Sequence, residues 1–271
     1  MPIALLLVIV FAQPCFAQVR WHSERSGVAV MVDVRTRRVL FAHGLREAAQ
    51  HPTYPGSTLK PILLLHLLRQ HRIDPTMRIA CTRSQRVRGV LMKCAHDADQ
   101  TSFDSEEALV WSCNTYFAKA ATLFHEGEME QTLRDYGLAS ETGWAKEEVR
   151  GEIPLAHDVE DREAMALGLG ERVTPLEMLE GYRRLALQLD VDSAGKLVRD
   201  ALAQTVDRGM ARAAHSDAMK ISGKTGTAVD RGESIGWFVG WADGKALVVR
   251  LEGGRGQDAA AVAKELFEAA R

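Results

Sequence analysis

Apolar residues form short separated runs at the beginning and at the end of the chain. Residues 27–34 and 39–42 are apolar runs on either side of a basic stretch, which predicts a hairpin of two strands. Residues 219–221, 235–241 and 246–251 form further extended apolar runs, joined in part by turn residues. We therefore expect strands from both ends of the chain to form one sheet.

The middle of the chain has the residue spacing of helices. Residues 79–189 are predicted to be mostly helical with irregular breaks, and helices are expected within them at 105–110 and 113–124. A helix is also expected over residues 57–71, where a proline falls in the first turn and costs little. Residues 257–270 form an amphipathic helix at the end of the chain.

This order of elements predicts an α+β fold, in which helices flank an antiparallel sheet and an all-helical subdomain is inserted into it. Residues 45–56 are polar and contain two prolines, so we expect them to be a loop. A single domain is expected over residues 18–271. Its sheet subdomain would comprise about 27–56 and 216–271, and its helical subdomain about 57–190.

The N-terminus has the pattern of an export signal. Residues 3–12 are an apolar run too short to span a bilayer, and Ala17 provides a small residue for cleavage, so residues 1–17 are expected to be a signal peptide. No Lys or Arg precedes this run, so an uncleaved anchor stays the alternative. We expect the protein to be secreted across the inner membrane into the periplasm or cell envelope.

Overall composition excludes some classes of function. With 271 residues, of which 46% are hydrophobic, the chain is able to bury a substantial core. Its net charge of -2 gives no electrostatic reason to bind nucleic acid, so we expect no such partner.

Three cysteines follow the signal. Cys81 and Cys94 could form a disulfide in an oxidising compartment, since the Arg-rich, Gly-containing stretch between them could form a hairpin-like loop. Cys94 and His96 could instead bind a metal, but no second Cys-x-x-Cys or His-x-x-x-His accompanies them. We therefore favour a disulfide or inert thiols and expect no metal or cofactor. Cys113 is expected to be a small buried apolar residue.

Ser57 and Lys60 are the first pair of candidate catalytic residues. At a helix N-terminus, Ser57 would have backbone N–H groups and the helix dipole nearby, which favour an alkoxide and an oxyanion. Lys60 lies three residues further on, on the same helical face. A lysine acts as a base only where burial or positive charge lowers its pKa, and Lys224 could supply that charge.

Two further short motifs add the remaining groups. Ser112 and Asn114 bracket Cys113 where two helices are predicted to meet, and would supply a proton relay and an amide to hold substrate. Residues 224–227 are expected on an edge strand that lines a groove. There they would bind a carboxylate, allow close approach of substrate backbone and complete an oxyanion hole through Lys224, Thr225, Gly226 and Thr227.

The three motifs together are typical of penicillin-recognising serine enzymes. The chain from about residue 27 to the C-terminus resembles the transpeptidase domain of class B penicillin-binding proteins, a family that shares its fold with serine β-lactamases. Four segments carry the resemblance, together with Trp-Phe-Val-Gly at 237–240: Tyr-Pro-Gly-Ser-Thr-Leu-Lys-Pro (54–61), Trp-Ser-Cys-Asn-Thr-Tyr-Phe (111–117), Gly-Leu-Gly-Glu-Arg-Val-Thr-Pro-Leu-Glu-Met (168–178) and Gly-Lys-Thr-Gly-Thr-Ala (223–228).

The resemblance implies a D,D-transpeptidase or D,D-carboxypeptidase acting on D-Ala-D-Ala stem peptides of peptidoglycan. Ser57 would be the nucleophile, Lys60 the base, and Ser112 the proton donor to the departing D-Ala. Asn114 would hold the acyl chain, while Lys224, Thr225 and Thr227 would bind the terminal carboxylate. β-Lactams would acylate Ser57 as mimics of the peptide, and proteins of cell-wall synthesis are expected as unidentified partners.

Two other functions stay open from the sequence. A class D-like β-lactamase is similarly small, but such enzymes normally carry Ser-x-Val in the middle motif and need a base for deacylation. Glu152 and Glu171 are the acidic residues weighed for that base, and both lie in predicted loops. A non-catalytic sensor of β-lactams or peptidoglycan that keeps the pocket is the third hypothesis.

Overall fold

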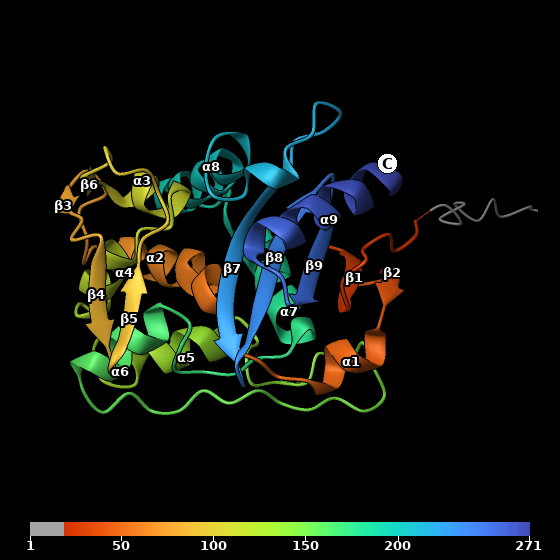
Figure 1. The fold of residues 1–271 in the computed structure, drawn as a ribbon, viewed down its shortest axis with the longest axis horizontal. Helices are drawn as coiled ribbons and strands as arrows, with labels where there is room; N and C mark the ends of the chain where they lie inside the picture. Colours follow the sequence, from red (N-terminus) through yellow and green to blue (C-terminus); the bar gives the residue numbers. More distant parts are fainter. Residues whose placement is uncertain (1–18) are drawn as a thin grey trace, which may run out of the picture.

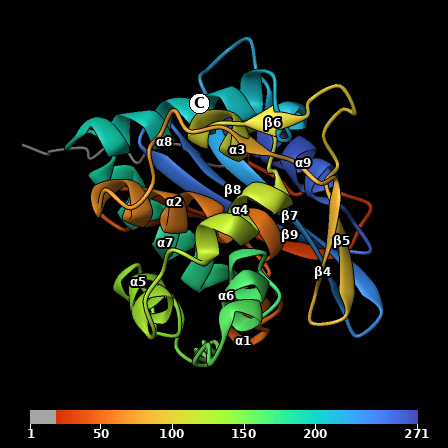
Figure 2. The ribbon, with the colours of Figure 1, turned by 90° about the vertical axis from the view of Figure 1, so that its left-hand side faces the viewer.

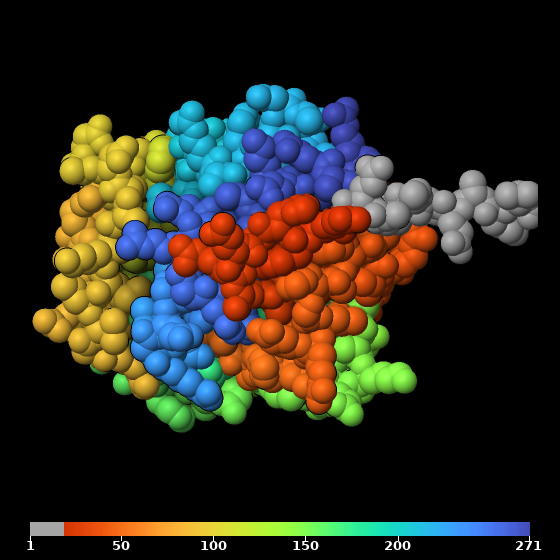
Figure 3. Space-filling view, turned by 45° about the vertical axis from the view of Figure 1, so that its right-hand side comes forward, coloured from red at the N-terminus to blue at the C-terminus, as the bar shows by residue number. Residues whose placement is uncertain are grey.

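The computed structural model describes residues 19–271, so the expected signal peptide lies outside the described residues. A five-stranded antiparallel sheet forms the centre of the fold (Figure 1), with strand order β2-β1-β9-β8-β7. Both ends of the chain contribute to it, as predicted, and Figure 3 shows the N-terminal segment lying against C-terminal elements. The strands are β1 (Gly27–Asp33), β2 (Val39–His43), β7 (Ser222–Asp230), β8 (Glu233–Ala242) and β9 (Lys245–Glu252).

Helices cover both faces of this sheet, which confirms the predicted α+β class. In the described part of the chain, no helix is long and apolar enough to span a bilayer. The helices are α1 (Leu45–Gln50), α2 (Lys60–Arg69), α3 (Ser105–Val110), α4 (Asn114–Ala121), α5 (Glu128–Asp135), α6 (Val159–Ala166), α7 (Pro175–Gln188), α8 (Ser193–Asp207) and α9 (Gly256–Ala269), with 3-10 turns η1 (Gly56–Leu59) and η2 (Arg212–Ala214).

The core is divided by the sheet into two layers. Side chains alternate between the faces of a strand. Val28, Val30 and Val32 of β1 therefore belong to the core shared with α7, whereas Ala29 and Met31 belong to the core shared with α9. Burial on both faces explains why β1 is a continuous apolar run in the sequence.

Four short strands lie in the region that was expected to be mostly helical, so the inserted subdomain is not all-helical. β3 (Ile79–Ala80) pairs with β6 (Ser102–Phe103), and β4 (Ser84–Val87) pairs with β5 (Val90–Lys93). Figure 2 shows β4 and β5 as a hairpin at the side of the molecule. These strands are too short to show an alternation of apolar and polar residues in the sequence. In β5, three of the four residues are also exposed. The hairpin does occupy the stretch between Cys81 and Cys94, as the cysteine spacing suggested.

The prediction of a loop over residues 45–56 was wrong in its first half, where α1 forms. This six-residue helix buries Ala48 and Ala49 and contacts β1 and α7. It ends before Pro52, because the residue before a proline disfavours helical backbone. Six residues are too few to show helical periodicity, so tertiary packing decides their structure.

Candidate active site

The first motif lies where η1 passes into α2. Ser57 is half-buried in η1, and Lys60 is the first residue of α2, with a fully buried side chain. Gly56 has a φ of +56°, and a Cβ there would lie 2.8 Å from the Thr227 carbonyl oxygen. Only glycine fits this left-handed position, so it brings η1 against β7.

The Lys60 amine turns toward the second motif. Its Nζ donates to Asn114 Oδ1 at 2.7 Å and to the Ser112 carbonyl oxygen at 2.9 Å, and lies 3.2 Å from Ser112 Oγ. Within residues 19–271, no hydrogen bond joins this amine to Ser57 Oγ, although the two residues are one turn apart. Catalytic hydrogen bonds often tighten only once substrate is bound.

The second motif forms the junction between α3 and α4, as predicted. Ser112 has a left-handed backbone with a φ of +55°, which is uncommon for a residue other than glycine. Cys113 is the N-cap of α4, and the Asn114 side-chain amide donates to the Lys93 carbonyl oxygen at 3.0 Å. Ser112 is thus held in a costly conformation by its surroundings, as is common at functional sites.

Lys224 links the third motif to the second. β7 is an edge strand of the sheet, as expected, and the Lys224 side chain on it is fully buried. Its Nζ lies 2.9 Å from Ser112 Oγ and donates to the Thr225 carbonyl oxygen at 3.0 Å. Ser112 Oγ therefore lies between two lysine amines, Lys60 and Lys224.

The remaining residues of β7 are positioned by neighbouring backbone. Thr225 Oγ1 donates to the Met210 carbonyl oxygen at 3.3 Å, and Thr227 Oγ1 accepts from the Gly256 N–H at 2.9 Å. A Cβ on Gly226 would lie 2.5 Å from the Pro55 carbonyl oxygen. The sequence suggested that Gly226 allows substrate backbone to approach. In the structure, the backbone at the start of η1 already lies close to Gly226, so glycine is required there without substrate.

One cavity of about 180 Å³ joins the three motifs. Six of the predicted site residues line it: Ser57, Ser112, Asn114, Thr225, Gly226 and Thr227. Lys60 and Lys224 reach the same place through their bonds to Ser112. Sequence reasoning missed the other six lining residues, which are Met92, Lys93, Ala95, Trp111, Leu167 and Met210. Trp111 could have been found by its place beside Ser112, whereas the predicted site motifs do not mark the other five.

Burial controls the charge of the two lysines. Burial lowers the pKa of Lys60 to about 7. Burial, and then the positive charge of Lys60, hold the pKa of Lys224 well below its usual value. The sequence reasoning expected Lys224 to depress the pKa of Lys60, but desolvation is the leading cause at both residues. The site therefore holds a neutral amine at neutral pH.

The cysteines are arranged differently from the expected pair. Cys81 Sγ and Cys94 Sγ lie 3.6 Å apart as free thiols, whereas a disulfide bond is about 2.05 Å long. Cys113 is buried, as predicted. The Cys113 sulfur lies in one cluster with the sulfurs of Cys81 and Cys94 and with the His96 ring.

Comparison with known proteins gives the family. Residues 27–270 match the model of the penicillin binding protein transpeptidase domain. The chain therefore belongs to this family, as the resemblance of its motifs indicated. No curated protein sequence matches the chain significantly.

Solved structures share the fold at low sequence identity. The D,D-transpeptidase domain of a peptidoglycan glycosyltransferase from Eggerthella lenta is 18% identical, with a TM-score of 0.81 over 92% of this chain and 78% of that chain. The transpeptidase domain of Burkholderia pseudomallei penicillin-binding protein 3 is 19% identical, with a TM-score of 0.80 over 92% of this chain and 88% of that chain. These likenesses confirm the predicted fold.

Proposed function

We propose that the protein is a serine D,D-transpeptidase or D,D-carboxypeptidase that acts on peptidoglycan stem peptides through an acyl-enzyme on Ser57. One observation carries this proposal: a chain of contacts runs from Lys60 Nζ through Ser112 Oγ to Lys224 Nζ, beside a cavity that Ser57 also lines. Nucleophile, base and proton relay are the groups that acyl transfer without a metal requires.

In the acylation step, Ser57 Oγ attacks the carbonyl carbon of the penultimate D-alanine, and neutral Lys60 accepts the hydroxyl proton. The backbone N–H groups of Ser57 and Thr227 stabilise the oxyanion. The C–N bond to the terminal D-alanine then breaks, and Ser112 donates a proton to the departing nitrogen. A lysine amine beside Ser112 restores that proton. Water or an acceptor amine finally attacks the ester and releases Ser57.

Residues of the second and third motifs hold the substrate. The second N–H of the Asn114 amide would hold the acyl chain. The bonds of Oδ1 to Lys60 and of the first N–H to the Lys93 carbonyl oxygen fix its orientation. Lys224, Thr225 and Thr227 bind the terminal carboxylate of the peptide. β-Lactams, which present a similar carbonyl and carboxylate, acylate the same serine. Because peptidoglycan lies outside the inner membrane, this substrate is consistent with our proposal of a periplasmic or cell-envelope protein with unidentified partners in cell-wall synthesis.

Rapid hydrolysis of β-lactams is less well supported, because it needs a base beside the acyl-enzyme. Glu152 is exposed, and neither it nor Glu171 lines the cavity. Glu171 is fully buried, and burial raises its pKa well above the usual value, which disfavours the charged form that a general base needs. The arrangement therefore favours a long-lived acyl-enzyme over a β-lactamase.

The proposal is tested by the intact mass of the protein after treatment with benzylpenicillin. We expect the wild type to gain the mass of one penicillin and the Ser57→Ala variant to gain none. Ser26→Ala, which removes an exposed serine far from the cavity in sequence, is the matched control and should be acylated normally. An unchanged mass in the wild type, or an adduct in Ser57→Ala, would contradict the assignment.

Two further readouts separate the alternatives. Slow release of a fluorescent penicillin supports a penicillin-binding enzyme, while rapid turnover of nitrocefin would support the β-lactamase instead. Ser57→Ala in cells tests the sensor hypothesis. Retained biological activity would favour a non-catalytic sensor, and lost activity would favour an enzyme.

A further inference from the structure

We propose that Cys81, Cys94, His96 and Cys113 bind one zinc ion beside the active site. The sequence offered no recognisable metal motif, and we expected none. The fold nevertheless gathers the four residues, since their three sulfur atoms and a ring nitrogen all lie within 4.8 Å of one another. Three thiolates and an imidazole are a ligand set that zinc prefers in structural sites.

The spacing of the ligand atoms fits a tetrahedral ion. Zn–S bonds of about 2.3 Å and Zn–N bonds of about 2.0 Å place two sulfurs about 3.8 Å apart, and a sulfur and a nitrogen about 3.5 Å apart. Cys81 Sγ lies 3.6 Å from Cys94 Sγ and 3.4 Å from His96 Nε2. These two separations match those of ligands around one ion, and the remaining pairs of ligand atoms lie within 4.8 Å.

Burial makes this a closed structural site rather than a hydrolytic one. Cys113, Cys94 and His96 are buried, and Cys81 is half-buried. Four protein ligands leave no open position for water or substrate.

Backbone donors already point at the sulfurs. The Arg83 N–H donates to Cys81 Sγ, and the Asn114 N–H donates to Cys94 Sγ, both at 3.3 Å. Hydrogen bonds to a thiolate favour its charged form, which is the form that binds metal. Three thiolates around a divalent ion leave one net negative charge, and the Arg83 guanidinium beside His96 offsets it.

The imidazole has a partner for its second nitrogen. When Nε2 binds the ion, Nδ1 carries the proton, and the Asp97 carbonyl oxygen at 3.2 Å is positioned to accept it. Arg83 Nη1 also lies 2.8 Å from Nδ1 and must shift slightly, while its hydrogen bonds to the Asp97 and His96 carbonyl oxygens can hold the guanidinium nearby.

The position of the four residues ties the β4–β5 hairpin to the active site. Cys81 precedes this hairpin, Cys94 follows it directly, and Cys113 lies between the two polar residues of the second motif. The ion would therefore fix Ser112 in its left-handed conformation and Asn114 against Cys94. This consequence rests on the proposed acyl transfer, whereas the metal site itself does not.

A disulfide accounts for fewer of the observations. Joining Cys81 to Cys94 would use two of the four groups and leave the Cys113 thiol and the His96 ring gathered without a role. A bound zinc ion uses all four, and zinc itself neither oxidises nor reduces the thiolates.

The site is tested by metal analysis of the intact protein, purified without chelator and then supplied with Zn²⁺ and desalted. We expect about one zinc per chain in the wild type and in His125→Ala, which removes an exposed histidine. His96→Ala and Cys81→Ser should bind far less. In the wild type, Co²⁺ in place of Zn²⁺ should give the intense thiolate-to-cobalt absorption of a tetrahedral site. No retained zinc in the wild type, or a mass two hydrogens lower with no metal, would overturn the proposal.

Chelation then separates this site from the proposed function. Removing the zinc should slow acylation by benzylpenicillin about 10²-fold, because small misplacements of reacting groups cost that much, and Zn²⁺ should restore the rate. An unchanged rate in the stripped protein would contradict the link to Ser112 and Asn114. Bound zinc with no acylation in any form would instead count against the acyl transfer alone.

Discussion

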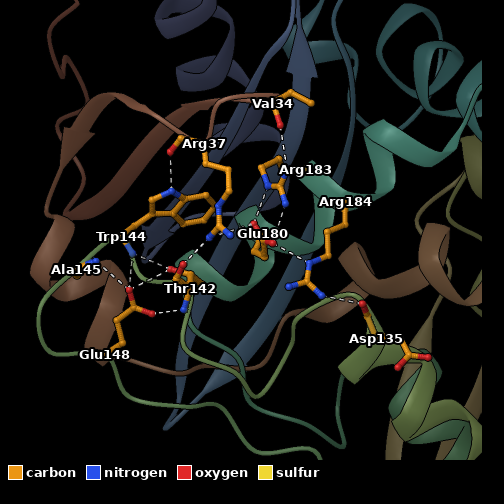
Figure 4. A network of polar contacts seen from close by, with 10 residues as sticks. All are labelled: Val34, Arg37, Asp135, Thr142, Trp144, Ala145, Glu148, Glu180, Arg183 and Arg184. Atoms are coloured by element: carbon orange, nitrogen blue, oxygen red, sulfur yellow. Dashed lines mark hydrogen bonds and ion pairs between the residues drawn. The ribbon is translucent and has the colours of Figure 1, made fainter.

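Two clusters of ionisable residues in this molecule are buried, and they differ in whether opposite charges are paired. In the candidate active site, two fully buried lysines, Lys60 and Lys224, share the hydroxyl of Ser112, and no carboxylate of residues 19–271 is bonded to either amine. On α7, buried Glu180 is surrounded by arginines (Figure 4). The first cluster brings together two amines whose charged forms burial disfavours, whereas the second pairs opposite charges.

The Glu180 cluster has the features of a structural network. Glu180 accepts from Arg183 at 2.8 Å and from Arg184 at 2.7 Å, and Arg183 also donates to the Val34 carbonyl oxygen at 3.0 Å. Burial alone would raise the pKa of Glu180, but the hydrogen bonds from Arg183 and Arg184 outweigh it and lower the pKa. The carboxylate therefore stays charged, and Arg183 beside it joins α7 to Val34, which directly follows β1.

Further contacts extend this network to the loop after α5. Arg37 Nη2 lies 3.9 Å from Glu180, and the Trp144 indole N–H donates to the Arg37 carbonyl oxygen at 2.8 Å. Glu148 accepts from the backbone N–H of Trp144 at 2.8 Å. Paired charges thus hold segments in place, while the unpaired lysines keep a neutral amine for chemistry. Perturbed pKa values of this second kind are common at functional sites.

Lys60→Met should have the largest effect, and only on reactivity. The substitution keeps a buried chain of similar length and removes the base, so acylation by benzylpenicillin should slow by about 10²- to 10⁴-fold. Thermal unfolding should change little or show a more stable protein. Lys119→Met on exposed α4 surface is the control and should react at the wild-type rate. A Lys60→Met rate within a few fold of wild type would contradict the assignment of the base.

Glu180→Gln should have the opposite result. It removes a buried charge and leaves Arg183 unpaired, so the free energy of unfolding should fall by about 3 to 5 kcal/mol. The rate of acylation per folded molecule should stay near the wild-type value, since Glu180 does not line the active-site cavity. Urea denaturation and stopped-flow acylation measure the two quantities. A slower acylation without a lower free energy of unfolding would contradict the structural role of Glu180.

The pH profile of acylation should follow the neutral lysine amine. The pKa of Lys60 lies near 7, below its unfolded value of about 10.5, so the fraction of neutral amine grows as the pH rises through 7. Acylation should therefore speed up from pH 5 to about 7 and level off above it, falling about tenfold per unit on the acid side. Because the two lysines interact, the observed midpoint belongs to the pair. A flat profile from pH 5 to 9 would exclude a titrating base.

Arg37→Ala should have the smallest effect. Arg37 is more exposed than the other arginines of the Glu180 network, and exposed ion pairs contribute about 0 to 1 kcal/mol. Arg37→Ala also removes the hydrogen bond from Arg37 to the Thr142 carbonyl oxygen. Apart from that loss, we expect the free energy of unfolding to fall by no more than about 1 kcal/mol. A loss as large as that of Glu180→Gln would show that surface charge, not burial, controls the network.

The candidate site was predictable from the sequence because its residues fall in short motifs. Ser57, Ser112 and Lys224 lie far apart in the sequence, yet each motif predicted its own place at a helix start, a helix junction or an edge strand. The sheet was predictable because its strands are buried on both faces and appear as apolar runs. The left-handed backbone of Ser112 could not be predicted, because serine does not usually adopt it.

Features that depend on long-range packing could not be predicted. Glu180 and Arg183 look like an exposed helical pair in the sequence, and only the approach of β1 and the loop after α5 buries them. The cluster of Cys81, Cys94, His96 and Cys113 has no regular spacing, because its ligands come from three separate segments. α1 and the β4–β5 hairpin are too short to show a period.

The most direct measurement is to locate the acyl group on the chain. The wild-type protein would be treated with benzylpenicillin, digested under mild acid and mapped by tandem mass spectrometry. We predict a penicilloyl group on the peptide that contains Ser57, and on no other peptide. Acylation of Ser112, of a lysine or of a cysteine, with an unmodified Ser57, would contradict the account.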